Sequence, residues 1–136
     1  MKIKLDPGAI MPTRAHALDA GLDLYAREMQ VVPAHGAAFF DTGVHMNLPA
    51  GTEGDVRSKS GLNRKHKLFC TGTIDEGYTG SIGVTLFNLG DEEYVVRAGD
   101  KIGQLVIHPI VRPHMVLVDE LDSFERGESG FGSTGR

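Results

Sequence analysis

Short runs of alternating hydrophobic and polar residues extend along most of the chain and predict an all-β fold. In residues 18–26, Leu22, Leu24 and Ala26 alternate with Asp23 and Tyr25, so the two sets face opposite sides of a strand. The same reasoning predicts strands at 2–5, 29–32, 37–48, 53–57, 68–70, 82–87, 94–96, 101–108 and 115–118, with 29–48 forming a hairpin around the turn 33–36. Turn residues separate these runs about every 8–12 residues, which is typical of a sandwich or barrel.

One basic segment interrupts this pattern. Residues 57–67 hold five lysines and arginines together with two serines and a glycine. The stretch after Ser60 predicts one short helix near 61–67, and we expect no other helix. A helix that begins near Ser60 presents free backbone N–H groups to an anion. A solvated basic loop is the alternative interpretation.

A glycine-rich stretch, residues 72–80, lies between the runs 68–70 and 82–87. Gly72, Gly77 and Gly80 can adopt positive φ without strain, so we expect a tight hairpin here. Its tip carries backbone polar groups, the carboxylate of Asp75 and the ring of Tyr78. Such a tip suits a flat polar heterocycle, although an ordinary turn accounts for the same residues.

The end of the chain has a different composition from the rest. Residues 126–136 contain four glycines, with Arg126 at the start and Phe131 in the middle, and such a segment has little to pack and much entropy to lose. We therefore expect a β domain over 1–125 and a flexible segment over 126–136. Gly130, Gly132 and Gly135 fit the spacing of a dinucleotide fingerprint, but one residue follows them, so no helix can open there.

Composition narrows the classes of protein that fit the pattern. The 136 residues suffice for one domain, and the net charge of −4 argues against nucleic-acid binding. The sequence has neither 18 consecutive apolar residues nor a signal-peptide core, so we expect a cytoplasmic protein that binds no membrane. The single cysteine, Cys70, is expected to be buried, and the six histidines lack metal-ligand spacing.

Five segments in a fixed order carry a resemblance to a known family. They are AGLDL (20–24), SKSGL (58–62), GTIDEGYTG (72–80), AGDKIGQL (98–105) and RGESGFGSTG (126–135). Together they resemble the five motifs of the trimeric dUTPases. The resemblance implies a jelly-roll or distorted β-barrel subunit and a homotrimer whose active sites lie at subunit interfaces, each built from three chains.

The resemblance also implies a reaction. dUTP and water give dUMP and pyrophosphate, which lowers dUTP and supplies dUMP for dTMP synthesis. Asp75 would act as the general base that activates water to attack the α-phosphorus. Mg²⁺ would be held mainly by the triphosphate, and Asp23 would reach it through water.

The remaining implied contacts bind the nucleotide. Tyr78 would pack against the deoxyribose and exclude a 2′-hydroxyl, while the tail 126–136 would close as a lid. Gly72, Thr73 and Ile74 would meet the base, and Gly83 matches another position that contacts the ligand. Lys59, Ser60, Gly61 and Gln104 would meet the phosphates. The lid would supply Arg126 to the γ-phosphate, Phe131 over the uracil, and Gly132. Lys59 stands where the family usually has arginine, which makes a different phosphate contact, and we expect it to pair with Asp100 as well.

Two other functions are compatible with the sequence. The dCTP deaminases resemble dUTPases in fold and use a glutamate in the hairpin region, where this chain has Glu76. A non-catalytic regulator that binds a nucleotide as a switch is the second alternative. The intact Asp75 and Gln104 favour the dUTPase interpretation.

Overall fold

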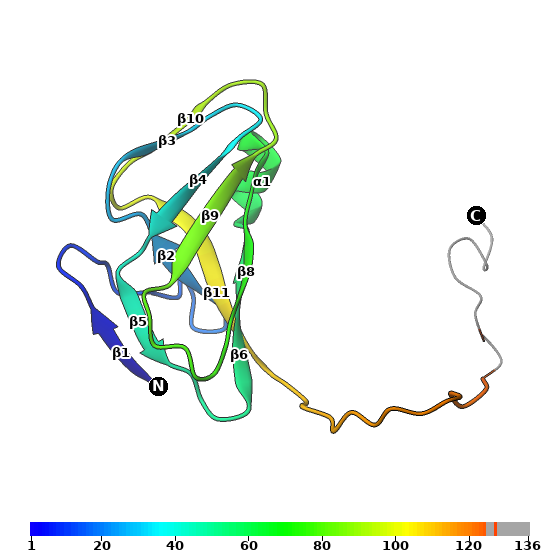
Figure 1. Ribbon diagram of the computed structural model, residues 1–136. Helices are drawn as coiled ribbons and strands as arrows, with labels where there is room; N and C mark the ends of the chain where they lie inside the picture. Colours follow the sequence, from blue (N-terminus) through cyan, green and yellow to red (C-terminus); the bar gives the residue numbers. More distant parts are fainter. Residues whose placement is uncertain (125–126, 128–136) are drawn as a thin grey trace.

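The computed structural model describes residues 1–124 and 127, and almost all regular structure in them is β (Figure 1). The strands are β1 (Lys2–Leu5), β2 (Gly21–Tyr25), β3 (Gln30–Val32), β4 (Ala37–Asp41), β5 (Val44–Asn47), β6 (Thr52–Arg57), β7 (Leu68–Phe69), β8 (Thr71–Ile74), β9 (Gly83–Asn88), β10 (Tyr94–Val96) and β11 (Lys101–Pro109). The one helix in this part of the chain is α1 (Ser60–His66). It confirms the predicted short helix, and its N-terminal residue is the predicted Ser60.

Two larger antiparallel sheets enclose the core. One has the strand order β2-β11-β6-β8 and the other β4-β9-β7, while β1 pairs with β5 and β3 with β10. In Figure 1, β4 and β9 lie in front of β2 and β11. The alternating residues face inward from both sheets, including Leu24, Val56 and Leu105 from the first and Phe40, Val84 and Leu86 from the second. Cys70 lies in this core as expected, and burial raises the pKa of its thiol.

The prediction of one hairpin over 29–48 is wrong. Residues 37–48 form two strands, because the chain turns at Gly43, where φ is +66°. β4 then pairs with β9, β5 with β1, and β3 with β10. Alternation continues through the turn in the sequence, so the pattern alone does not reveal that the strand changes partner. β2 also begins at Gly21, later than predicted.

The predicted hairpin over 72–80 is also wrong in its details. β7 does pair with β9, but β8 pairs with β6 in the other sheet. Gly72, Gly77 and Gly80 do not have positive φ; among the described glycines that conformation occurs at Gly8, Gly43, Gly51, Gly99 and Gly127. Gly80 is needed for space instead, since a Cβ there would overlap the Tyr78 hydroxyl. The chain reverses through a turn in which the N–H of Tyr78 donates to the carbonyl of Asp75 at 3.0 Å.

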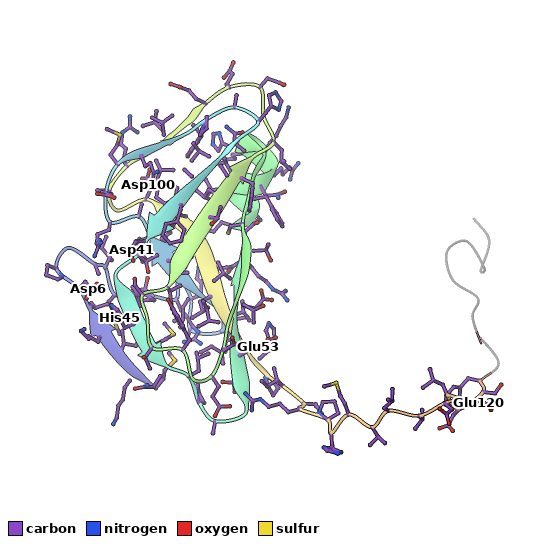
Figure 2. All side chains as sticks on the ribbon, viewed as in Figure 1. Asp6, Asp41, His45, Glu53, Asp100 and Glu120 are labelled. Carbon is purple, nitrogen blue, oxygen red and sulfur yellow. The ribbon has the colours of Figure 1, made fainter. Side chains whose placement is uncertain are left out.

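Residues 110–124 leave the body of the molecule as an extended arm (Figures 1 and 2). The strand predicted at 115–118 is absent from this part of the structure, since no neighbouring strand in the described chain supplies hydrogen bonds. Seven apolar side chains of the arm are exposed: Val111, Met115, Val116, Leu117, Val118, Leu121 and Phe124. Among the described residues, no helix is long and apolar enough to cross a membrane.

Candidate active site

A row of polar residues crosses the four-stranded sheet on its outward face. Gln104 of β11 lies opposite Asp23 of β2 on one side and Arg57 of β6 on the other. Directly opposed residues of neighbouring strands point to the same face. The intervening positions, such as Leu105 and Val56, face the core. The sheet therefore brings together Asp23 and Gln104, two residues predicted for the site that lie far apart in the sequence.

Asp23 is buried although it belongs to the polar face. It is 5% exposed. Lys59 Nζ binds its Oδ1, and Lys101 Nζ lies 2.6 Å from its Oδ2. The expected pair between Lys59 and Asp100 is wrong, because Lys59 binds Asp23 instead, while the Asp100 carboxylate accepts a bond from the N–H of Arg97 at 2.8 Å. Burial of Asp23 works to raise its pKa, but the bonds from Lys101 and Lys59 outweigh burial and lower it.

This lowered pKa predicts a loss of stability in acid. The contribution of Asp23 is present above its ordinary pKa of about 4 and disappears as the pH falls through the lower folded value. We expect Asp23→Asn to lower the free energy of unfolding by about 1–3 kcal/mol at pH 6, because two partly exposed lysines lose their anion. The difference from the wild type should shrink towards pH 3 in urea titrations. Asp119→Asn, at an exposed carboxylate of the arm, is the control; an equal response of both variants contradicts the prediction.

A cleft of about 500 Å³ opens over this polar row. Its walls include three cations, Arg57, Lys59 and Lys101, and two carboxylates, Asp19 and Asp23. A Cβ at Gly21 would overlap the Gln104 side chain, so this glycine leaves room for the amide to lie across β2. Gln104 Nε2 donates to the Ser58 carbonyl at 3.3 Å. The excess of positive charge suits an anionic ligand.

The start of α1 adjoins this cleft through Lys59. The backbone N–H groups of its first turn have no intrahelical partner, and no side chain caps them. A Cβ at Gly61 would meet no atom within 4 Å, and a ligand can therefore approach the backbone closely. The predicted residues Lys59, Ser60 and Gly61 thus lie on the side of Asp23 and Gln104.

A second cluster of predicted residues lies on the loop between β8 and β9. The Asp75 side chain is exposed, and Tyr78 is 45% exposed with its hydroxyl donating to the Ser81 carbonyl at 2.9 Å. β8 is the last strand of its sheet, while β9 belongs to the other sheet. One edge of β8, the strand that contains Gly72, Thr73 and Ile74, is therefore unpaired in the described chain. Gly83 begins β9, the next strand along the chain.

The neighbouring carboxylate, Glu76, is bound through one of its oxygens. Its Oε2 accepts a bond from the N–H of Gly51 at 3.1 Å and lies 2.8 Å from Arg112 Nη2. The Gly51 bond, followed by Arg112, lowers the pKa of Glu76. Glu76 therefore holds the loop to the β5–β6 turn and to the start of the arm.

The two clusters are separated within one chain. Asp75 follows the end of β8, where Ile74 lies opposite Gly54 of β6. Asp23 lies on β2, two strands beyond β6, and its row crosses β6 at Arg57. With strands about 4.8 Å apart and about 3.3 Å per residue, Asp75 and Asp23 are on the order of 15–20 Å apart. A single chain thus does not bring all the predicted residues together. Arg126, Phe131 and Gly132 lie outside the described residues.

Lys101 is a member of the cleft that the sequence did not single out. Simple alternation along 101–108 would place Lys101 with Gly103 and Leu105 on the core face. A β-bulge between Lys101 and Gly103 shifts the register, so that Lys101 lies opposite Tyr25 and on the face of Asp23. The glycine at 103 is a weak signal for such a bulge.

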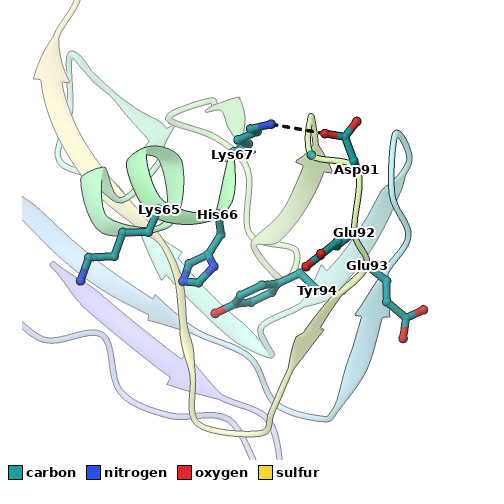
Figure 3. A pocket seen from close by; sticks show the side chains of 8 residues that line it. Lys65, His66, Lys67, Asp91, Glu92, Glu93 and Tyr94 are labelled. Carbon is teal, nitrogen blue, oxygen red and sulfur yellow. Dashed lines mark ion pairs between the residues drawn. The ribbon is translucent and has the colours of Figure 1, made fainter.

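Another cavity, of about 440 Å³, lies between the end of α1 and β10 (Figure 3). Charges of both signs line it, and Lys67 Nζ lies 3.5 Å from Asp91 Oδ2. The rings of His66 and Tyr94 pack with centroids 4.7 Å apart. None of the predicted site residues lines this cavity, and its charges are already paired in part.

Comparison with known proteins identifies the family. A family model described as dUTPase matches residues 8–135. The deoxyuridine 5′-triphosphate nucleotidohydrolases of Clostridium acetobutylicum and Oryza sativa subsp. japonica are 47% and 44% identical to this chain over 97% of it, and over 93% and 78% of their own lengths. The chain therefore belongs to the dUTPase family, which confirms the resemblance.

Solved structures agree with this assignment. A mutant dUTPase of Staphylococcus bacteriophage 80alpha with dUpNHpp has a TM-score of 0.92 and 33% identity, covering 99% of this chain and 98% of that one. A mutant dUTPase of phage phi11 of S. aureus, described with a structural Mg(II) ion, has a TM-score of 0.81 and 31% identity over 88% of this chain and 96% of that one. These similarities confirm the predicted all-β jelly-roll class.

Proposed function

We propose that the two clusters are complementary halves of a shared active site. As a member of the dUTPase family, the chain is an enzyme that hydrolyses dUTP to dUMP and pyrophosphate. The observation that carries the division into halves is the strand order and register, which place Asp75 and Asp23 at opposite sides of one sheet. The cations and Gln104 around Asp23 suit the phosphates, whereas Asp75, Tyr78 and the free edge of β8 suit the reacting phosphorus, the sugar and the base.

A homotrimer would complete the site. Besides the separation of Asp75 from Asp23, two surfaces support assembly with further copies. The arm 110–124 exposes its apolar side chains, and the outward face of β4-β9-β7 exposes Phe39, Phe69 and Phe87, with Phe39 61% exposed. Burial of such surfaces against a second copy is favourable. In this arrangement one chain supplies the phosphate cleft and another supplies Asp75.

In the proposed reaction, Asp75 orients a water molecule and takes its proton as the water attacks the α-phosphorus. Asp75 is an exposed aspartate, so its placement matters more than its basicity. Lys59, Ser60, Gly61, Gln104 and the newly identified Lys101 hold phosphate oxygens. The backbone of Gly72, Thr73 and Ile74 binds the uracil edge, Gly83 makes a further contact with the nucleotide, and Tyr78 packs on the deoxyribose.

The residues around the cleft fit Mg²⁺ that arrives with the triphosphate. Among the described residues, no group of three or more His, Cys, Asp or Glu side chains could hold a metal, and both oxygens of Asp23 already bind lysines. Asp23 would therefore act through water, as predicted. When bound, Mg²⁺ neutralises phosphate charge and orients the phosphate oxygens.

The C-terminal segment is the last element of the proposed site. Residues 126–136 would close over the nucleotide, with Arg126 at the γ-phosphate, Phe131 on the uracil and Gly132 beside it. The family match extends to residue 135 and includes this segment. Closure would exclude water from the reacting groups and strengthen their electrostatic contacts.

Tyr78→Ala should admit UTP. Removing the ring opens space for a 2′-hydroxyl, so we expect the preference for dUTP over UTP in kcat/KM to fall about 10–100-fold. Tyr78→Phe is the matched control, because it keeps the ring and loses only the bond to Ser81. Parallel assays of pyrophosphate release from both nucleotides measure the ratio. Unchanged rejection of UTP by Tyr78→Ala would contradict the role of the ring.

The overall function is tested with four nucleotides. Pyrophosphate release is measured from dUTP, dCTP, dTTP and UTP, first with Mg²⁺ and then with EDTA. We expect rapid release from dUTP alone and its loss in EDTA. Ammonia from dCTP would identify a deaminase instead, and binding of dUTP without turnover would identify a regulator. The ion pair of Glu76 with Arg112 and its bond from Gly51 argue against the deaminase, because they give this carboxylate a structural role in holding the loop.

A further inference from the structure

A chain of charged side chains lies behind the loop that carries Asp75 and Tyr78. Arg27 joins two carboxylates, with Nη1 3.7 Å from Asp6 Oδ2 and Nη2 2.9 Å from Asp41 Oδ2. His45 of β5 lies beside Asp6, with its Nε2 3.2 Å from Asp6 Oδ2. Figure 2 shows Asp6, Asp41 and His45 gathered on the side of the molecule where β1 and β5 lie. None of these residues belongs to the site described above.

This charged group holds the loop at two points. Asp41 Oδ1 accepts a bond from the Ser81 hydroxyl and another, at 3.1 Å, from the N–H of Gly43. The Nδ1 of His45 lies 2.9 Å from the carbonyl oxygen of Thr79. Because the Tyr78 hydroxyl donates to the Ser81 carbonyl, both points bear directly on the turn from Asp75 to Tyr78.

The surroundings of His45 favour a proton on each ring nitrogen. The Thr79 carbonyl can only accept a bond, so Nδ1 must donate. Nε2 is buried and makes no hydrogen bond within the described chain, and its nearest ionic partner is the Asp6 carboxylate. In a neutral ring with its proton on Nδ1, the lone pair of Nε2 would face that carboxylate. The imidazolium form alone satisfies both neighbours.

The other charges near His45 act in both directions. Lys2 and Lys4 line the same groove as His45 and Thr79, and Lys4 disfavours a second positive charge. Arg27 shares the Asp6 carboxylate. The bond to the Thr79 carbonyl, followed by the Asp6 carboxylate, prevails and raises the pKa of His45.

We propose that His45 is a positioning residue for dUTP hydrolysis, whose protonated ring holds the Thr79 carbonyl and thereby keeps the Asp75–Tyr78 turn in its nucleotide-binding geometry. This role rests on the proposed functions of Asp75 and Tyr78. A raised folded pKa means that the ring is fully protonated below about pH 6.5 and loses its Nε2 proton as the pH rises through the folded value. The neutral ring can still donate from Nδ1 to Thr79, but the Nε2 lone pair then faces the Asp6 carboxylate, so Asp6 no longer holds the ring in place and the bond to Thr79 weakens. Binding of dUTP should therefore weaken with rising pH, more in KM than in kcat, because bound nucleotide helps to order the turn.

The experiment measures KM and kcat for dUTP between pH 5.5 and 9, and the His45 pKa by NMR of the imidazole. We expect the wild-type KM to rise about 3–10-fold in one step at the NMR pKa, less than the roughly 10²-fold loss that a misplaced group can cause. His45→Gln keeps an N–H for Thr79 but cannot titrate, so its KM should show no step. His45→Leu should have a high KM throughout, and Asp6→Asn should move the step to lower pH. His35→Gln, at an exposed histidine beside Asp91, should keep the wild-type step.

A step that survives in His45→Leu, or that fails to move in Asp6→Asn, would overturn this role. A wild-type KM that shows no step at the NMR pKa of His45 would also overturn the role of His45, but it would leave the proposed reaction intact. If the wild type released no pyrophosphate from dUTP at any pH, the proposed function would fail and the role of His45 with it. The same kinetic data therefore distinguish failure of the His45 role from failure of the proposed function.

Discussion

Asp75→Asn is expected to lower kcat for dUTP by about 10²–10⁴-fold, the usual contribution of a general base, and to leave KM within a few-fold. Asparagine keeps the size of the side chain and its place after β8, but its amide cannot take a proton from water. Because Asp75 is exposed and turns away from the core, the variant should fold like the wild type. Pyrophosphate release and thermal unfolding measure the two quantities.

The adjacent carboxylate provides a matched control. Glu76→Gln removes a charge one residue away, but Glu76 is bound by Gly51 and Arg112. We expect its kcat to stay within about threefold of the wild type and its melting temperature to fall slightly, as for a partly exposed ion pair. The reverse result, with Glu76 essential and Asp75 dispensable, would support the deaminase alternative.

Two inactive variants should restore activity when they assemble together. Asp75→Asn lacks the base, and Gln104→Glu places a negative charge against the phosphates, so each alone should be nearly inactive. If Asp75 and Gln104 of one site come from different chains, random mixing yields intact sites at about one quarter of the wild-type number. If one chain supplied both residues, mixing would restore nothing.

The mixing experiment is carried out by refolding the two variants together at equal concentration and measuring pyrophosphate release from dUTP. The control mixes Asp75→Asn with the double variant Asp75→Asn/Gln104→Glu, which cannot form an intact site in any arrangement. Recovery near one quarter in the first mixture and none in the second would support shared sites. Absence of recovery in both, in assemblies shown to contain both variants, would contradict them.

The sequence predicted the parts of the fold that depend on local pattern. Alternation identified β2 through Leu22 and Leu24, and it identified β11 almost to its ends. Strand partners depend on residues far away in the sequence, so the same pattern missed the exchange of partners at Gly43 and the divergence of β8 from β9. For the same reason it predicted a strand at 115–118, where the alternation is present but the described chain offers no partner.

The candidate site was predicted to a similar degree. Family motifs selected Asp23, Gln104 and Asp75, and the structure places the first two side by side. Lys101 was missed because a bulge reverses its face, and Lys59 was assigned to Asp100 because the depth of Asp23 in the cleft cannot be deduced from spacing. Nor does the sequence show that Asp75 lies far from Asp23 within one chain, since that distance follows from the order of the strands.

The position of β11 in its sheet has a consequence for synthesis of the protein. β11 is the last strand along the described chain, yet it lies between β2 and β6 and pairs with both. Until residue 109 has left the ribosome, these two earlier strands have no partner between them, and the core side chains of β11 are missing. Because such distant pairings close large loops, the sheet should form late and slowly. A nascent chain therefore keeps the core faces of β2 and β6 uncovered until residue 109 has emerged.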